Sequence, residues 1–313
     1  MKALVCWAGC SWLVAFALTC LLLFEQTVAA SYTYPSSDQI VVASTRNYST
    51  ASSAVGFTLD LNSFRGRAYD ACGNVRQLVD FRNAEGFVET WIFVHGNQID
   101  ATMAVDRGLR AYRNLRATSA NRGPIRFIIW SWPSERTKNR ISDARLKSKR
   151  TDAEMFYFGS FLSQIARQGP IGIIGYSFGA RVVSGGLHLS EGGTLCGKYL
   201  PTACSPVCPY RVAFLAAAVE NDGLCGSGRY RNALNHVSHL LLQNNSRDKA
   251  LRFFWVIGRN RPKALGRTSM KFAPRHVHVR QYDWADAIGK DHSVWNYLER
   301  PIILRRVIET ISR

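Results

Sequence analysis

One segment of the chain has the residue types and the spacing for nucleophilic catalysis. Residues 175–179 read Gly-Tyr-Ser-Phe-Gly, the G-x-S-x-G pattern, and follow the apolar run 171–174 directly. Glycines on both sides of Ser177 allow a sharp turn from a strand into a helix. The helix N-terminus would stabilise negative charge that develops beside the serine. We therefore predict that Ser177 is a nucleophile and that Gly175 and Gly179 shape its turn; the alternative is a surface turn that happens to contain a serine.

A serine hydroxyl needs a base that removes its proton and an acid that orients the base. On a strand–turn–helix scaffold of this kind the three residues follow strands in the chain order Ser, acid, His. His292 lies after the last predicted strand, at 276–282, and opens the closing helix, so we predict that it is the base. The other histidines do not fit this order. His95 precedes the serine, and His188 lies inside the helix expected after the serine turn. His236 and His239 precede the favoured acid, and His276 and His278 lie inside the last predicted strand.

Two carboxylates compete for the role of the acid. Asp248 follows the predicted strand 237–242, and Asp222 follows the earlier predicted strand 212–219. We favour Asp248 because it follows the later strand, and we keep Asp222 as the alternative acid. Either residue could instead be an ordinary solvated carboxylate.

Apolar strands alternate with helical patterns along the chain. Strands are predicted at 39–44, 90–94, 126–132, 171–176, 212–219, 237–242 and 276–282. Helices are predicted at 104–115, at 151–168 with Thr151 as the cap, at 230–236, and at 293–312 with an interruption at Pro301. The segment 47–87 gives no clear prediction. Continuous apolar strands that alternate with helices indicate a mostly parallel sheet covered by helices on both faces.

Several segments together resemble the α/β-hydrolase superfamily. They are Phe93-Val94-His95-Gly96-Asn97, Ser131-Trp132-Pro133-Ser134, the Ser177 turn, Asn245-Ser246-Arg247-Asp248-Lys249-Ala250-Leu251 and Asp291-His292-Ser293. In this order they are similar to an uncharacterised esterase-like group with a Phe-Val-His-Gly signature. The resemblance covers about 41–292.

The resemblance implies a set of roles. Ser177 would be the nucleophile, Asp248 the orienting acid and His292 the general base, and the backbone N–H groups of Phe178 and Asn97 would form the oxyanion hole. Where the group often has an aromatic residue and then Asn after His-Gly, this chain has Asn97-Gln98. A cysteine-rich excursion at 189–209 is a second departure, and it could cover the substrate entrance.

The first 30 residues predict export from the cytoplasm. Lys2 precedes an apolar stretch at 3–24, and Val28 and Ala30 satisfy the small-residue rule for cleavage after Ala30. The alternative is an uncleaved membrane anchor, because the apolar stretch is nearly long enough to span a bilayer. We expect residues 31–313 to form a single domain outside the cytoplasm, either secreted or anchored.

Five of the eight cysteines lie after residue 30. Four of them, Cys196, Cys204, Cys208 and Cys225, fall within a short stretch rich in glycine and proline, and Cys72 is remote. In an oxidising compartment this pattern predicts disulfides within an insertion around 189–225, with the pairing left open. The stretch has no Cys-x-x-Cys spacing for zinc, and we predict neither a metal nor a cofactor.

The chain carries a net charge of +18. Much of the excess lies at 136–150, which could attract an anionic polymer or membrane surface, or could be a solvated surface segment. We expect no nucleic-acid partner, because zinc-finger spacing, an RNP motif and leucine-zipper heptads are missing from the sequence.

These features predict a serine hydrolase that cleaves carboxylic esters, with a small-molecule or lipid-like substrate, through an acyl-enzyme. The main alternative is a catalytically inactive hydrolase-like module that binds anionic polymers or membrane surfaces. A third reading is a metal-dependent hydrolase built on His276 and His278, which share one face of a predicted strand.

Overall fold

A computed structural model describes residues 34–35, 37–50, 56–82, 89–119, 122–136, 139–201, 205–257, 261–270 and 272–312. The predicted signal or anchor segment at 1–30 lies outside these residues. None of the helices in the described ranges is long and apolar enough to cross a membrane. All of the elements below belong to one compact unit, Ser36–Arg313.

A nine-stranded sheet forms the centre of this unit, in the order β11-β10-β9-β6-β4-β5-β1-β2-β3. Its strands are β1 (Gln39–Ser44), β2 (Arg65–Tyr69), β3 (Val75–Asp80), β4 (Glu89–Val94), β5 (Ile125–Ser131), β6 (Ile171–Tyr176), β9 (Tyr210–Leu215), β10 (Val237–Asn244) and β11 (His278–Asp283). Only the pairs β1–β2 and β2–β3 are antiparallel within this sheet; the other neighbours run parallel. A small hairpin of β7 (Thr194–Leu195) and β8 (Lys198–Tyr199) stands apart from it.

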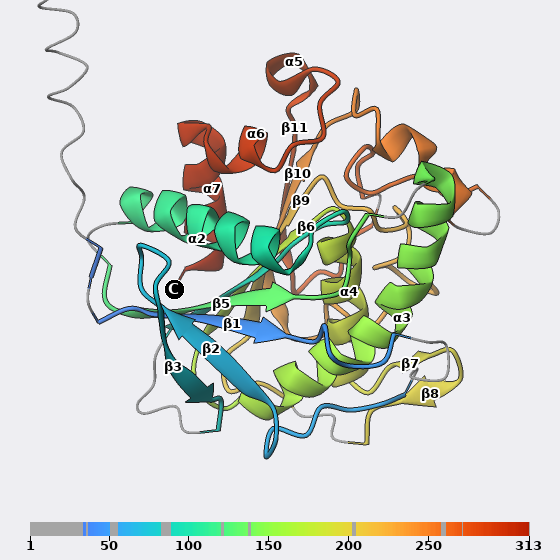
Figure 1. Cartoon of the computed structure of the whole chain (residues 1–313). Helices are drawn as coiled ribbons and strands as arrows, with labels where there is room; N and C mark the ends of the chain where they lie inside the picture. Colours follow the sequence, from blue (N-terminus) through green and yellow to red (C-terminus); the bar gives the residue numbers. More distant parts are fainter. Residues whose placement is uncertain are drawn as a thin grey trace, which may run out of the picture. The chain divides into compact units, whose positions relative to one another are not determined.

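Helices cover both faces of the sheet (Figure 1). On one face α2 (Ala101–Thr118) and α7 (Pro301–Ile311) pack together, and on the other α3 (Arg140–Ile165) packs along α4 (Phe178–Ser190). The short helices α5 (Ala285–Ile288) and α6 (Trp295–Leu298) precede α7, and Pro301 at the first position of α7 marks the predicted interruption. Burial on both faces explains why β4, β5 and β6 are mostly apolar along their length and do not alternate between apolar and polar residues.

The strand order positions the loops that carry chemistry. The chain passes from β4 to β5 on one side and then crosses to β6 on the other side of β4. Loops that follow strands on either side of such a reversal leave a crevice between them, where ligands of parallel sheets bind. The predicted fold class, an α/β-hydrolase fold with a mostly parallel sheet and helices on both faces, is confirmed.

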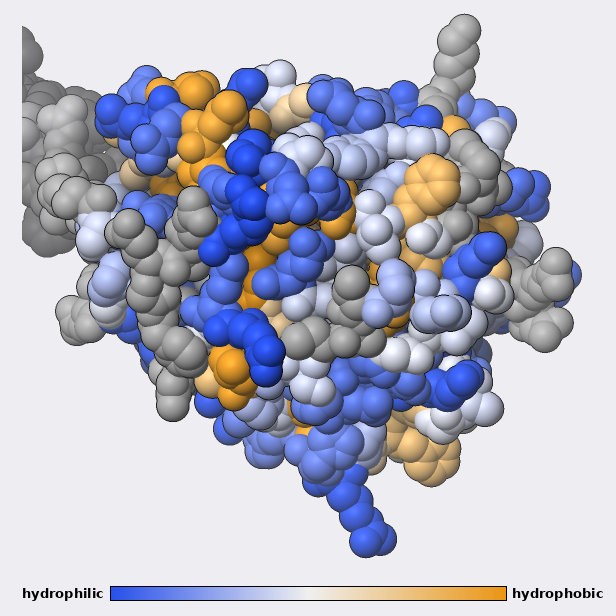
Figure 2. All heavy atoms as spheres, turned by 90° about the horizontal axis from the view of Figure 1, so that it is seen from below, coloured by the Kyte–Doolittle hydropathy of each residue, from blue (hydrophilic) through white to orange (hydrophobic). Residues whose placement is uncertain are grey.

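One face of the molecule is mixed in polarity (Figure 2). Figure 2, which views the molecule from below Figure 1, shows mainly hydrophilic side chains with hydrophobic groups in small patches between them. Exposed apolar side chains such as Leu78 on β3 and Val75 at its start come from the antiparallel end of the sheet. Single exposed apolar residues of this kind are normal for a folded domain.

The helix expected at 151–168 begins eleven residues earlier than predicted. It is α3, which starts at Arg140, so Thr151 lies inside the helix and is not its cap. The Thr151 hydroxyl donates to the Ser148 carbonyl and accepts a hydrogen bond from Arg181 Nε at 3.1 Å. The basic segment 136–150 is therefore helical from Arg140 onward. Within it, Asp143 and Lys147 pair across one helical turn at 3.4 Å in a buried position.

Two other expectations about elements need correction. Residues 230–236 form consecutive turns with bonds such as Ala233 N–H to Tyr230 C=O, and not a helix. The last strand starts at His278, so His276 precedes it. The segment 47–87, which gave no prediction, contributes β2 and β3. Short turns and edge strands carry weak periodicity, and their tertiary partners decide their conformation.

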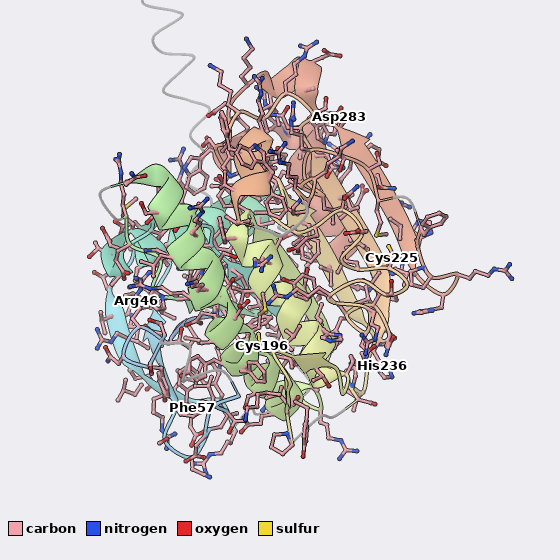
Figure 3. The ribbon with its side chains drawn as sticks, turned by 90° about the vertical axis from the view of Figure 1, so that its right-hand side faces the viewer. Arg46, Phe57, Cys196, Cys225, His236 and Asp283 are labelled. Carbon is pink, nitrogen blue, oxygen red and sulfur yellow. The ribbon has the colours of Figure 1, made fainter. Side chains whose placement is uncertain are left out.

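The expected disulfides are not found among the described cysteines. Cys72, Cys196, Cys208 and Cys225 are free, and Cys204 lies outside the described residues. Cys196 and Cys225 lie well apart (Figure 3), and the Cys225 thiol donates to the Phe272 carbonyl at 2.6 Å. The β7–β8 hairpin, rather than a disulfide, orders the beginning of this segment.

A buried glutamate in the core gives the first testable prediction. Glu154 on α3 is fully buried, and burial raises its pKa to about 8, although a hydrogen bond from Thr45 Oγ1 at 2.8 Å acts in the opposite direction. A raised pKa in the folded state means that the folded protein binds more protons than the unfolded chain between about pH 4.5 and about pH 8. This group therefore lowers the free energy of unfolding by roughly 1.4 kcal/mol per pH unit as the pH rises through that window.

We expect Glu154→Gln to remove this slope, because glutamine keeps an acceptor for Thr45 and carries no charge. The variant should be more stable than the wild type at pH 8 and gain little at pH 5. Urea unfolding at the two pH values measures the difference. An equal effect of the substitution at both pH values would show that Glu154 does not titrate in this range.

Candidate active site

Ser177 lies at the apex of the sharp turn between β6 and α4. Its backbone adopts φ 52° and ψ −119°, a strained conformation that residues other than glycine rarely adopt. A Cβ on Gly175 would lie 2.7 Å from Ala180 Cα, and one on Gly179 would lie 2.1 Å from the Val94 carbonyl oxygen. Both positions therefore require glycine. The turn holds Ser177 at the end of β6, next to the neighbouring strand β4 and the loop that follows it.

We expect Gly179→Ala to destabilise the protein by at least about 3 kcal/mol, because a backbone atom of a central strand would have to move. Gly123→Ala is the matched control: its Cβ would meet no atom within 4 Å, and we expect a change of about 0.5 kcal/mol or less. Thermal and urea unfolding of both variants measure the effect. A stable Gly179→Ala protein would show that α4 can move away from β4.

The structure brings Ser177, His292 and Asp248 together from three separate segments. His292 Nε2 lies 2.9 Å from Ser177 Oγ, and His292 Nδ1 lies 2.5 Å from Asp248 Oδ2. The Asp248 side chain is fully buried, and the His292 side chain is 24% exposed. With Nδ1–H donated to the carboxylate, Nε2 is free to accept the serine proton.

Asp248 is held by its own loop. It follows β10, and its Oδ1 accepts the backbone N–H of Leu251 at 2.9 Å, at the start of the 3-10 helix η2 (Leu251–Val256). The other oxygen is thereby left for His292. The alternative acid Asp222 lies in the turns after β9, and no contact joins it to His292 within the described residues.

The His292 loop is fixed from two sides. The Tyr176 hydroxyl donates to the His292 carbonyl, and the two rings lie 5.4 Å apart between centroids. Burial and, next, the charge of Asp248 raise the pKa of Tyr176, which keeps this donor protonated. On the other side, Asn245 Nδ2 donates to the Asp291 carbonyl at 3.1 Å. These contacts tie the base to the ends of β6 and β10.

The loop after β4 lies against the serine. A Cβ on Gly96 would be 3.2 Å from Ser177 Cβ, so this loop touches the turn that carries Ser177. Asn97 Nδ2 donates to Asp143 Oδ2 of α3 at 2.7 Å, and Gln98 has a positive φ of 61°. Among the described residues, no hydrogen bond is formed by the backbone N–H of Asn97 or of Phe178.

His95 is a structural residue of the same loop. It is buried, and burial lowers its pKa to about 3, so its ring is neutral. Nε2 accepts the Trp132 backbone N–H at 3.3 Å, and Nδ1 therefore donates to the Gly96 carbonyl at 2.9 Å. The Trp132 ring stacks on His95 and donates to the His95 carbonyl at 2.8 Å. The motif residues 95–97 and 131–134 thus support one another.

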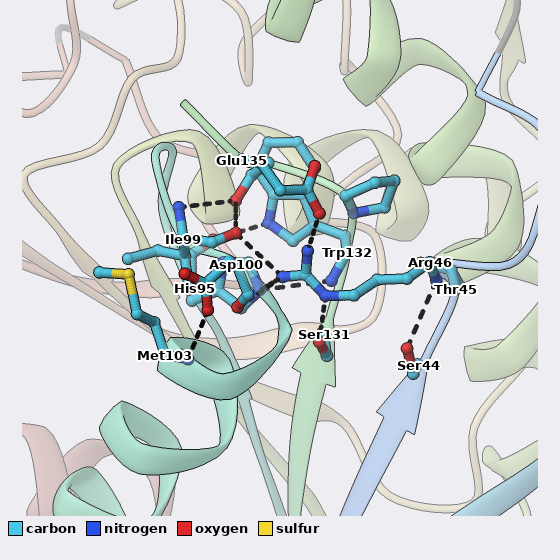
Figure 4. A network of polar contacts seen from close by, with 12 residues as sticks. Ser44, Thr45, Arg46, His95, Ile99, Asp100, Met103, Ser131, Trp132 and Glu135 are labelled. Atoms are coloured by element: carbon cyan, nitrogen blue, oxygen red, sulfur yellow. Dashed lines mark hydrogen bonds and ion pairs between the residues drawn. The ribbon is translucent and has the colours of Figure 1, made fainter. Parts of the chain in front are cut away.

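Arg46 binds the loop that follows β4 through several hydrogen bonds (Figure 4). It follows β1 and donates to the carbonyls of Ile99 and Asp100 at 3.0 and 3.1 Å and to Ser131 Oγ at 2.8 Å, and it pairs with Glu135. Neither Arg46 nor Tyr176 was predicted from the sequence to belong to the site. An arginine that donates to several carbonyls of one loop can be found only once the loop conformation is known.

The remaining predicted histidines lie elsewhere. His276 Nε2 donates to the Leu234 carbonyl at 2.9 Å. The His278 ring lies tilted beside the His239 ring, with 5.5 Å between centroids, and accepts a hydrogen bond from Arg280 Nε. No group of three or more metal-binding side chains is found in the described ranges.

A scan against models of protein families finds no match, and a search of curated proteins finds none either. Among solved structures the chain is similar to an inhibited esterase B from Lactobacillus rhamnosis, with 14% identity, a TM-score of 0.35, and 95% of this chain and 91% of that chain covered. It is also similar to a thermophilic esterase from Thermogutta terrifontis, with 11% identity, a TM-score of 0.36 and coverages of 79% and 85%. A third similar structure is an α/β hydrolase from a deep-sea metagenome, with 15% identity, a TM-score of 0.30 and coverages of 80% and 96%. By its own strand order and by the turn that carries Ser177 between β6 and α4, the chain has the α/β-hydrolase fold.

Proposed function

We propose that this protein is a serine hydrolase that cleaves carboxylic esters through an acyl-enzyme. The observation that carries the proposal is the continuous hydrogen-bonded chain from Ser177 through His292 to Asp248, with distances of 2.9 and 2.5 Å. The strained serine turn and the buried carboxylate support it, because each is costly to keep without a function.

In the proposed mechanism Ser177 Oγ attacks the ester carbonyl carbon while His292 Nε2 takes the hydroxyl proton. The imidazolium, stabilised by Asp248, then gives this proton to the departing alcohol oxygen, and the acyl group stays on Ser177. Water attacks the acyl-enzyme, His292 takes its proton and returns it to Ser177, and the carboxylic acid leaves. Each proton that His292 accepts is given back, so the enzyme is regenerated.

The developing oxyanion needs donors that are already in place. The backbone N–H groups of Phe178 and Asn97 suit this role, because both flank Ser177 and neither is used by the described residues. The Asn97 to Asp143 bond and the Arg46 network would hold the Asn97 segment still. Loss of one such donor costs about 100-fold or more in turnover in well-studied hydrolases.

The substrate in this proposal is a small-molecule or lipid-like ester, and the enzyme acts outside the cytoplasm, secreted or held by its N-terminal segment. The competing proposal is an inactive module that binds anionic polymers or membranes through residues 136–150. The ordered hydrogen bonds at Ser177 favour the enzyme, because a binding module has no need of a base aligned on a serine.

Labelling with a fluorophosphonate probe tests the proposal, since the probe reacts with an activated serine hydroxyl. We expect the wild-type protein to label and to release p-nitrophenol from p-nitrophenyl esters. The histidine variant His292→Ala should do neither while it unfolds like the wild type. A folded wild-type protein that neither labels nor turns over would overturn the hydrolase proposal.

A further inference from the structure

A pocket lined by positive charge opens beside the loop that carries Asp248. This basic pocket has a volume of about 540 Å³, in the range of small-molecule sites. Its lining consists of Ser246, Leu251, Arg252, Trp255, Arg261, Pro262, Lys263, Ala264, Arg267 and Thr268. Four of these side chains are cationic and none is acidic.

The four cations have no acidic partner of their own. Arg252, Arg261, Lys263 and Arg267 form no ion pair with any residue that the structure describes. Neighbouring Arg247, which does not line the pocket, pairs with Asp286 at 2.9 Å. Like charges gathered around one hollow repel one another and create a positive potential that an anion relieves.

The pocket also offers groups suited to a bound oxyanion. Arg267 uses Nε to donate to the Ser246 carbonyl at 2.9 Å, which fixes its guanidinium against the Asp248 loop. The Arg261 guanidinium lies 5.8 Å from the Trp255 ring centroid, and Trp255 is 45% exposed. Arginines near a half-exposed aromatic ring provide both forked donors for a carboxylate or phosphate and an apolar wall for a carbon chain.

The backbone connects this pocket to Ser177. One wall, η2, begins at Leu251, whose N–H binds Asp248. The other wall pairs with the segment after β9, because Leu265 N–H donates to Val219 C=O at 2.7 Å and Gly266 N–H donates to Ala217 C=O at 2.9 Å. Ala218 N–H in turn donates to the Ser177 carbonyl at 3.1 Å. Two successive spacings between hydrogen-bonded backbone segments, each of about 4.8 Å, put the backbone of this wall on the order of 10 Å from the backbone of Ser177.

We infer that the basic pocket binds an anionic group, a carboxylate or phosphate, at the end of the ester substrate remote from the scissile bond. This inference rests on the proposed function and adds the substrate class: esters in which a carbon chain of about 10 Å separates the reacting carbonyl from an anion. The lining charges select the anionic end, and Trp255 packs along the chain.

Matched pairs of p-nitrophenyl esters test the inference. The mono-ester of sebacic acid and the decanoate have chains of equal length with and without a terminal carboxylate, and the mono-ester of succinic acid and the butyrate form a short pair. We expect the wild-type protein to prefer the charged ester in the long pair, measured as the ratio of kcat/KM values, and to show a smaller preference in the short pair. Equal ratios in both pairs would overturn the inference.

Charge variants separate the pocket from the field of the whole protein. Arg252→Gln combined with Lys263→Gln should lower the long-pair ratio about tenfold, because two charge-assisted contacts are lost. Arg275→Gln combined with Arg305→Gln removes the same charge from exposed positions before β11 and on α7 and should leave the ratio within about twofold. An equal drop in both double variants would assign the preference to long-range attraction and overturn the inference.

Two further measurements distinguish other outcomes. Inorganic phosphate should compete with the sebacate ester and leave turnover of the decanoate unchanged. A change in decanoate turnover would mean that the pocket takes a free anion rather than part of the substrate.

Calorimetry with free sebacate tests the pocket without catalysis. We expect the Ser177→Ala protein to bind sebacate, and we expect this binding to be lost when Arg252→Gln and Lys263→Gln are added. Binding of sebacate by a wild-type protein that shows no esterase activity would overturn the proposed function but leave the pocket standing.

Discussion

Ser177→Ala is expected to lower kcat for ester hydrolysis by roughly 10⁴-fold or more and to abolish fluorophosphonate labelling. The substitution removes the atom that would attack the carbonyl, and His292 is left with no nucleophile to activate. Losses on the order of 10⁶ follow when the same atom is removed from a well-studied serine protease. Initial rates with p-nitrophenyl butyrate, together with in-gel labelling, measure the effect.

Ser184→Ala provides a matched control on the same helix. Ser184 is buried and donates to the Ala180 carbonyl at 2.8 Å, so its loss perturbs α4 without touching His292. We expect this variant to keep its labelling and its turnover within about threefold, because a single neutral hydrogen bond contributes about 1 kcal/mol. Full activity in Ser177→Ala would remove Ser177 from the mechanism.

The second large effect is expected for Asp248→Asn, a loss of roughly 10⁴-fold in kcat. The carboxylate accepts the proton-bearing Nδ1 of His292 at 2.5 Å, and an amide in its place favours the wrong tautomer of the ring. It also removes the negative charge that stabilises the imidazolium. Because the other oxygen of Asp248 accepts from Leu251, the asparagine variant can retain the loop.

Asp222→Asn is the natural comparison, because the sequence left both aspartates open. We expect its turnover to stay within about twofold of the wild type, since Asp222 lies in the turns after β9 and does not contact His292. Steady-state kinetics of the two variants, with circular dichroism as a folding control, decide between the acids. The reverse ranking would place the catalytic carboxylate in the segment after β9.

The sequence by itself determined the central part of this site. The G-x-S-x-G pattern after an apolar run predicted the strand, the turn and the helix, because glycine spacing and strand periodicity are local properties. The order of the strands along the chain favoured Asp248 and His292, and the structure places His292 between Ser177 and Asp248. The layered fold could be predicted for the same reason, since continuous apolar strands require cover on both faces.

Tertiary structure alone decided how these residues are held and what surrounds them. The bond from Tyr176 to the His292 carbonyl, the Asn97 to Asp143 bond and the network of Arg46 join residues that lie far apart in the chain. The free cysteines and the early start of α3 also went against the sequence patterns. The basic pocket beside Asp248 joins η2 to the segment 261–268. Such features depend on which segments meet after folding, and residue type and periodicity do not encode that meeting locally.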